Sequence, residues 1–213
     1  MEGYVSEQEQ VEALKRWWKA NGKSVILGVV IGVAIVGGGR WWLANQKTQA
    51  ELASEQYEQV LLEVQKGDSA AAVEQGGRLL QNNTKSNYAA LTALELAKLK
   101  VGQSDLEGAR FYLQWIMDHS SVAPLKDVAR LRLAQVLLAK GDKAGALQSV
   151  EAVADMKAFV VPAQELKGDI FMAMGRANDA RTAYDAALAA NSSGVDQSRL
   201  QMKLAEAGGK GAS

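Results

Sequence analysis

The sequence predicts an all-α protein in which a single N-terminal transmembrane helix precedes a solenoid of about four helix pairs and a C-terminal capping helix. Three observations support this fold class. An uncharged apolar run occupies residues 24–39, glycines recur at similar intervals from Gly67 onward, and the chain is rich in alanine and leucine but holds only 2 prolines. Alanine and leucine favour helices, whereas proline interrupts them.

Residues 24–44 form the predicted transmembrane helix. With a rise of ~1.5 Å per residue, this stretch spans about 31 Å, which matches a hydrocarbon core of ~30 Å. Tryptophan pairs at 17–18 and 41–42 flank it, as expected at membrane interfaces. A cleaved signal peptide with its cleavage site near Gly39 is the alternative. The long leading segment, which carries acids as well as bases, argues against it.

Basic residues set the predicted orientation of this helix. Four lie shortly before it and two after its apolar run: Lys15, Arg16, Lys19 and Lys23 against Arg40 and Lys47. Because cytoplasmic flanks carry the excess of lysine and arginine, residues 1–23 are expected in the cytoplasm and residues from 45 onward across the membrane. We expect residues 1–23 to form an amphipathic segment that begins with a capping box at Ser6 and ends at Asn21–Gly22.

Two further features concern the transmembrane helix itself. Gly28 and Gly32 have the small-xxx-small spacing that lets a second transmembrane helix pack closely. Residues 40–66 contain no glycine or proline, so the helix is expected to continue beyond the membrane into the next domain.

Regular glycines divide the rest of the chain into helix pairs. Each ends a helical pattern, and a small residue opens the following helix: Gly67 with Ala72, Gly102 with Ala109, Gly141 with Ala146 and Gly175 with Ala180. The alanine comes five residues after the glycine in three cases and seven in the second, which predicts a longer turn there. A helix often ends in a left-handed residue, for which glycine is favoured, and closely crossing helices need small side chains.

A period near 34 residues with small residues at these places is typical of tetratricopeptide repeats (TPRs). Gly168 and Ala134 would occupy the small position of the first helix in their pairs. We therefore expect residues 45–207 to form a TPR-like domain, with 195–207 as its capping helix. Residues 208–213 are expected to be a disordered tail.

The sequence holds no recognisable catalytic, metal or cofactor motif. It has no cysteine and one histidine, His119, at a predicted helix end. Residues 50–213 carry 18 bases and 20 acids, and this net charge of −2 argues against a nucleic-acid partner. We expect a binding protein and no enzyme.

The first helix of each pair is expected to line the concave face of the solenoid. With the glycines placed at the turns, the candidate groove residues are Tyr57, Leu61, Val64, Leu96, Leu99, Leu131, Gln135, Leu138, Glu165, Asp169 and Met172. A largely apolar groove with a few acids suits an extended or helical peptide. The alternative interpretation is that these apolar side chains pack between helices.

Residues 10–42, QVEALKRWWKANGKSVILGVVIGVAIVGGGRWW, resemble the N-terminus of the YfgM family of ancillary SecYEG translocon subunits. The similarity extends through residues 86–99, 128–147 and 200–204. The resemblance implies a single-pass type II protein of the bacterial inner membrane with a periplasmic TPR-like domain and no catalytic residues. It implies three partners besides the lipid bilayer: the SecYEG translocon, a PpiD-like membrane-anchored periplasmic chaperone, and unfolded secretory proteins.

The expected function is therefore a membrane-anchored adaptor of the Sec translocon that binds a periplasmic chaperone, emerging secretory proteins, or both. A membrane-tethered regulatory scaffold for a signalling or envelope-assembly protein is the alternative. The mixed-charge segment before the transmembrane helix favours the alternative, because a simple anchor would not need it.

Overall fold

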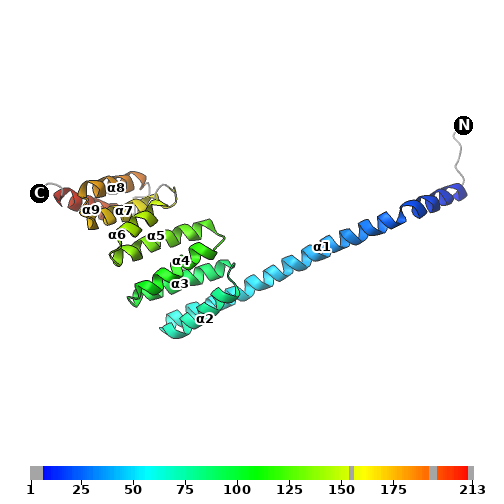
Figure 1. Ribbon diagram of the computed structural model, residues 1–213, viewed down its shortest axis with the longest axis horizontal. Helices are drawn as coiled ribbons and strands as arrows, with labels where there is room; N and C mark the ends of the chain where they lie inside the picture. Colours follow the sequence, from blue (N-terminus) through cyan, green and yellow to red (C-terminus); the bar gives the residue numbers. More distant parts are fainter. Residues whose placement is uncertain (1–6, 154–155, 192–195, 211–213) are drawn as a thin grey trace. The chain divides into compact units, whose positions relative to one another are not determined.

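The computed structural model describes residues 7–153, 156–191 and 196–210, and its regular structure over these ranges consists of helices (Figure 1). The chain divides into two compact units, Met1–Glu51 and Leu52–Ser213. The capping box expected at Ser6 lies outside the described residues.

Helix α1 (Glu7–Lys66) is continuous, so the helix end predicted at Asn21–Gly22 is wrong. The Asn21 side chain donates a hydrogen bond to the Trp17 carbonyl at 3.1 Å, and Gly22 lies against the Trp18 indole. Both residues therefore contact the preceding helical turn. A glycine inside a helix costs only about 1 kcal/mol, which is less than the cost of leaving backbone groups unpaired at the start of an apolar span. The predicted continuation of the helix through residues 40–66 is confirmed.

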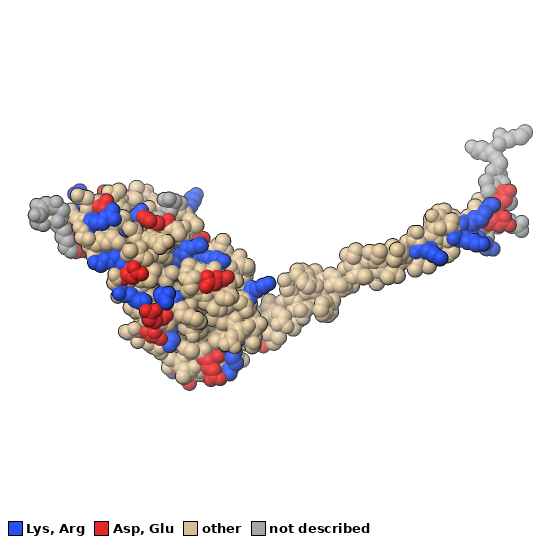
Figure 2. Space-filling view, viewed as in Figure 1, with Lys and Arg blue, Asp and Glu red and all other residues tan. Residues whose placement is uncertain are grey.

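The middle of α1 is the candidate membrane span among the described residues, by length and composition. Its large apolar side chains from Ile26 to Val36 are 49–68% exposed within the protein, and Figure 2 shows a stretch of α1 without charged side chains. Burying one such side chain away from water gains about 1.5–3 kcal/mol, so lipid is the favourable surrounding for this stretch. Gly28 and Gly32 lie in the span with open space beside them, and their packing against a partner helix stays a prediction.

Eight helices follow α1 in the described residues of the second unit: α2 (Ser69–Asn82), α3 (Asn87–Gly102), α4 (Leu106–His119), α5 (Ala123–Ala139), α6 (Lys143–Glu151), α7 (Val160–Ala173), α8 (Ala177–Ala190) and α9 (Gln197–Lys210). The end of α1 shares a core cluster with α2, and the next three pairs are α3–α4, α5–α6 and α7–α8. Helix α9 packs against α8, which confirms the predicted solenoid and its capping helix. Residues 208–210 are helical, contrary to the predicted tail, while 211–213 lie outside the described residues.

Each turn within a helix pair has one residue in the left-handed conformation, and this residue is glycine in every pair except α3–α4. Gly67, Gly141 and Gly175 have φ angles of 79°, 84° and 77°, as predicted for left-handed turn residues. Gly102 instead ends α3, and Ser104 takes the left-handed conformation with a φ of 60°. Counted from Ser104, Ala109 comes five residues later, as in the other pairs. The two additional residues thus lengthen α3 and leave the register of the pair unchanged.

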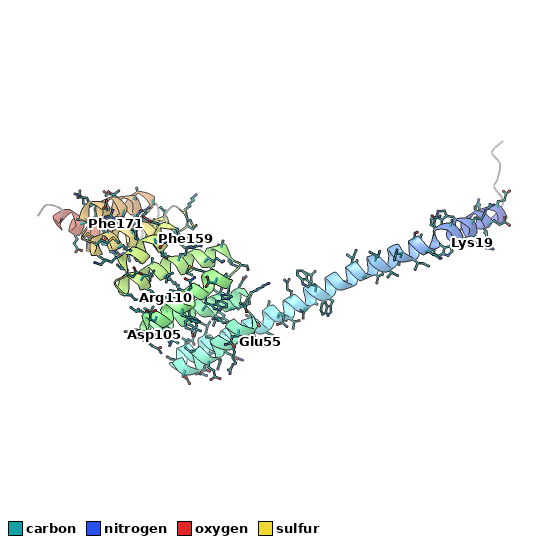
Figure 3. The ribbon with its side chains drawn as sticks, viewed as in Figure 1. Lys19, Glu55, Asp105, Arg110, Phe159 and Phe171 are labelled. Atoms are coloured by element: carbon teal, nitrogen blue, oxygen red, sulfur yellow. The ribbon has the colours of Figure 1, made fainter. Side chains whose placement is uncertain are left out.

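Small residues mark the closest contacts between paired helices. The alanines that open the second helices, Ala72, Ala109, Ala146 and Ala180, are all fully buried. Three of the turns also carry an N-cap that we did not predict. The side chains of Asp68, Asp105 (labelled in Figure 3) and Asp142 each accept a hydrogen bond from the backbone N–H group three residues on, at 2.8–3.0 Å. Such caps each stabilise a helix by about 1 kcal/mol.

The crossing of α7 and α8 depends on Gly168. A Cβ atom at this position would lie 2.3 Å from the Tyr184 ring, closer than side-chain atoms pack. Tyr184 is buried and cannot turn away freely, since its hydroxyl donates a hydrogen bond to Asp169 Oδ1 at 2.8 Å. The predicted small positions are confirmed here and at Ala134, which is fully buried.

Replacing Gly168 with alanine should therefore destabilise the protein by about 1–3 kcal/mol, the usual cost of overpacking a core. The measurement is urea unfolding of the full chain in detergent, monitored by circular dichroism. Gly77→Ala on α2 is the matched control, because a Cβ at Gly77 meets nothing within 4 Å. It should be neutral or stabilising by up to about 1 kcal/mol. An equal loss of stability in both variants would contradict the close crossing.

Candidate functional site

The predicted groove residues lie on the first helices of the four pairs: the end of α1, α3, α5 and α7. Most of the apolar ones belong to core clusters or pack against them: Tyr57, Val64, Leu96, Leu99, Leu131, Leu138 and Met172. Leu61 is half-buried and Gln135 is exposed. Packing between helices therefore accounts for seven of these side chains, and a direct role of the set in binding stays a prediction.

A pocket of about 340 Å³ opens between three helices of the second and third pairs. It is lined from α3 by Ala97, Lys98 and Val101, from α4 by Leu106 and Leu113, and from α5 by Arg132, Gln135, Val136 and Ala139. We call it the α3–α5 pocket. Because it joins the first helices of adjacent pairs, it is the structure's best candidate for a partner-binding site within the described residues.

Helix rotation explains why only Gln135 is common to the predicted groove and this pocket. Leu96 packs against Gly76 of α2, where a Cβ atom would lie 2.7 Å from the leucine side chain. This contact turns Leu96 into the core and brings Lys98 and Val101 to the pocket. On α5 the observed lining includes Arg132 where Leu131 was predicted, a shift of one residue or about 100° around the helix.

The acidic end of the predicted groove is covered by α9. Arg199 Nη2 lies 2.8 Å from Glu165 Oε2, and Lys203 Nζ lies 2.8 Å from Glu165 Oε1 and 2.7 Å from Asp169 Oδ2. With the hydroxyl of Tyr184 on Asp169, these groups form one network between α7, α8 and α9. Glu165 and Asp169 thus hold the capping helix in place, so their expected role in a groove is taken by an internal contact.

Sequence reasoning missed this network, although a signal for it exists. Glu165 and Asp169 are four residues apart, as are Arg199 and Lys203, and the two pairs are separated by 34 residues. Opposite charges at the same helical spacing, one repeat apart, are expected to face each other when repeats stack.

The network shifts the pKa values of its members. Burial alone would raise the pKa of Glu165, but hydrogen bonds from Lys203 and Arg199 outweigh burial and hold it below its usual value. Burial alone would lower the pKa of Lys203, but Asp169 and Glu165 outweigh it and raise that pKa. Burial, and then the bond to Asp169, raise the pKa of Tyr184 far above its usual range, so its hydroxyl stays a hydrogen-bond donor.

Other candidate chemistry is sparse in the described ranges. His119 ends α4, where its ring stacks on Trp115 with 4.7 Å between centroids and its Nδ1 lies 2.9 Å from the Trp115 carbonyl oxygen. Within the residues that the structure describes, no three His, Cys, Asp or Glu side chains are grouped as a metal site would require.

Comparison with known proteins agrees with the repeat architecture. Residues 15–209 match the family model described as a tetratricopeptide repeat-like domain. A relative from Aggregatibacter actinomycetemcomitans, named "Ancillary SecYEG translocon subunit", is 34% identical over 94% of this chain and 97% of its own. The chain belongs to this family.

The predicted resemblance to the ancillary SecYEG translocon subunits is thus confirmed. Family members of that name from Escherichia coli K12 and Haemophilus influenzae are 32% and 31% identical and cover 96% and 94% of this chain, and 98% and 97% of their own. Two solved structures share the fold. They are a putative kinesin light chain from Podosopora anserina with nearly identical TPR-like repeats (TM-score 0.60, 19% identity, 77% of this chain and 88% of that chain) and MamA (TM-score 0.53, 15% identity, 76% and 91%).

The contact between α9 and α7 should depend on pH. Because the pKa of Glu165 is lowered in the folded protein, its stabilisation is present above the unfolded pKa and is lost as the pH falls through the folded one. Glu165→Gln should cost about 1.5–3 kcal/mol near pH 7, the usual contribution of hydrogen bonds to a charged group. The thermal midpoint of the wild type should then fall more on acidification to about pH 3 than that of the variant.

The exposed pair of Glu74 and Arg78 on α2 provides the control, because surface ion pairs contribute about 0–1 kcal/mol. Glu74→Gln should keep the wild-type pH profile of the thermal midpoint. If Glu165→Gln also keeps that profile, the network does not stabilise the docked α9.

Proposed function

We propose that this protein is a non-enzymatic accessory subunit of the Sec translocon, anchored in the bacterial inner membrane by α1. Its repeat domain would bind a PpiD-like membrane-anchored periplasmic chaperone, emerging secretory chains, or both. One observation carries the proposal: relatives named ancillary SecYEG translocon subunit align with this chain over nearly their whole length, through both the apolar span and the repeats.

The architecture supports an adaptor in particular. Helix α1 is continuous from the candidate span to Lys66, so the first helix of the repeat domain is an extension of the anchor. Tethering of this kind holds a binding domain near its partners at an effective concentration that can reach the millimolar range, so weak individual contacts suffice. The α3–α5 pocket is an open site for such a contact.

The proposed orientation places the N-terminus in the cytoplasm and the repeats in the periplasm. Lys15, Arg16, Lys19 and Lys23 precede the span, and Figure 2 shows basic side chains gathered toward this end of α1. The excess of lysine and arginine on this side supports the orientation by the positive-inside rule.

Single cysteines can test the orientation, since the chain has none of its own. Glu9 and Glu58 are exposed on opposite sides of the span along the sequence. In intact spheroplasts, a membrane-impermeant maleimide should label Glu58→Cys and spare Glu9→Cys, and detergent should make both reactive. Labelling of Glu9→Cys alone in intact spheroplasts would reverse the orientation.

Affinity purification in mild detergent tests the function. The tagged full chain should recover SecYEG subunits and a periplasmic chaperone, both identified by mass spectrometry. Replacing residues 52–213 with an unrelated periplasmic domain should remove the chaperone and keep SecYEG. The double variant Gly28→Leu, Gly32→Leu should weaken SecYEG recovery, because the bulky side chains prevent close helix approach.

The matched control for the double variant is Gly37→Leu, Gly38→Leu, which adds the same side chains elsewhere in the span. It should leave SecYEG recovery unchanged. Failure of the full chain to recover either partner would contradict the proposed function. It would favour the regulatory scaffold, whose test is the loss of other partners when residues 2–14 are deleted.

A further inference from the structure

We propose that the α3–α5 pocket binds an unfolded polypeptide segment in which an aliphatic side chain lies next to a carboxylate. The inference rests on the proposed function for the source of that segment, an emerging secretory chain. The chemistry of the segment follows from the side chains that line the pocket.

The shape and lining of the pocket fit one or two aliphatic side chains. Its volume of about 340 Å³ is near the lower end of the range for ligand pockets. Leu113 and Val136 are 1% and 5% exposed and form its base, while Val101 is 46% exposed at its edge. Covering the exposed apolar surface of Val101 is favourable, so an entering aliphatic side chain gains burial with little rearrangement.

Arg132 gives the pocket a positive charge that has no protein partner among the described residues. It is half-buried and, across the ranges that the structure describes, it has no ion pair or side-chain hydrogen bond. The α5 residues three and four positions away from it are uncharged, so no partner is supplied within the helix. Its neighbour Arg130, in contrast, donates a hydrogen bond to Asp127 at 2.8 Å.

The other polar lining residues also favour an acidic segment. Lys98 adds a second positive charge, and its partner Glu95 is held only loosely at 3.6 Å. Gln135 is exposed and offers an amide that can both donate to and accept from an extended peptide backbone. The described lining residues thus comprise six apolar side chains, two cations and one neutral amide.

An unfolded chain matches this combination better than a folded partner does. The guanidinium group of Arg132 can form two parallel hydrogen bonds with one carboxylate. The pocket therefore needs only one carboxylate beside one aliphatic side chain, and many extended segments contain this combination. A stable folded partner usually needs a continuous interface of about 1,000 Å² or more.

Photo-crosslinking to the full chain in nanodiscs tests the proposal directly. The probes are three Gly/Ser peptides that carry one photo-leucine followed by glutamate, glutamine or lysine. Peptide mapping by mass spectrometry quantifies the crosslinks to α3 and α5. We expect labelling of the pocket to be strongest with the glutamate peptide and about tenfold weaker with the lysine peptide, the scale of one charge-assisted hydrogen bond.

Arg132→Glu should reverse this order, so that the lysine peptide labels the pocket best, and Arg132→Gln should weaken the preference for the glutamate peptide, because Lys98 remains. Arg181→Glu, at an exposed arginine on α8, makes the same charge change away from the pocket and should keep the wild-type order. Absence of pocket labelling, equal labelling by the three peptides, or an order unchanged by Arg132→Glu would each overturn the proposal.

These outcomes are independent of the test of the proposed function. A chain that recovers SecYEG but shows no preference among the peptides would retain its translocon role and lose this binding mode. A preference for the glutamate peptide without recovery of SecYEG would support this binding mode and contradict the translocon role.

Discussion

The close crossing of paired helices is the constraint on which the repeat domain depends. Fully buried alanines open the second helix of each pair, and Gly168 lies directly beneath the Tyr184 ring. A larger side chain at such a place would separate the two helices and open the apolar surface between them. Since each pair buries its remaining face on the next, a defect in one crossing would also weaken its neighbours. The spacing of small residues therefore determines both the pair and the stack.

This dependence explains how far the sequence predicts the structure. Turn glycines and the alanines that follow them are local signals, so the helix pairs and the long first helix could be located by inspection. The use of Ser104 and not Gly102 as the left-handed turn residue could not be predicted in this way, because serine adopts that conformation only when the surrounding packing requires it. The uninterrupted helix through Asn21–Gly22 was missed for a related reason: a weak local stop signal is overridden at the start of an apolar span, where backbone groups must form their hydrogen bonds within the helix.

The binding surface was harder to predict than the fold. Which residues face a groove depends on helix rotation, and rotation is set by contacts between helices, such as that of Leu96 with Gly76. An error of one residue turns the face by about 100° and exchanges Leu131, which packs on the core, for Arg132, which lines the pocket. A pattern of apolar residues shows which helices are amphipathic, but it does not separate the side chains that fill the core from those left for a partner.

The capping helix affects whether another copy of the repeat can stack on the end of the solenoid. A solenoid has two ends, and an uncovered end is a surface on which another copy of the same repeat could stack, in a head-to-tail manner that never closes. Helix α9 covers the last pair by means of Arg199 and Lys203, whose charges match carboxylates one repeat earlier. Its exposed positions include the polar side chains of Gln201 and Glu206 beside the apolar side chain of Met202. The ion network thus holds over the α7–α8 pair a helix that would have to be displaced before another repeat could stack there.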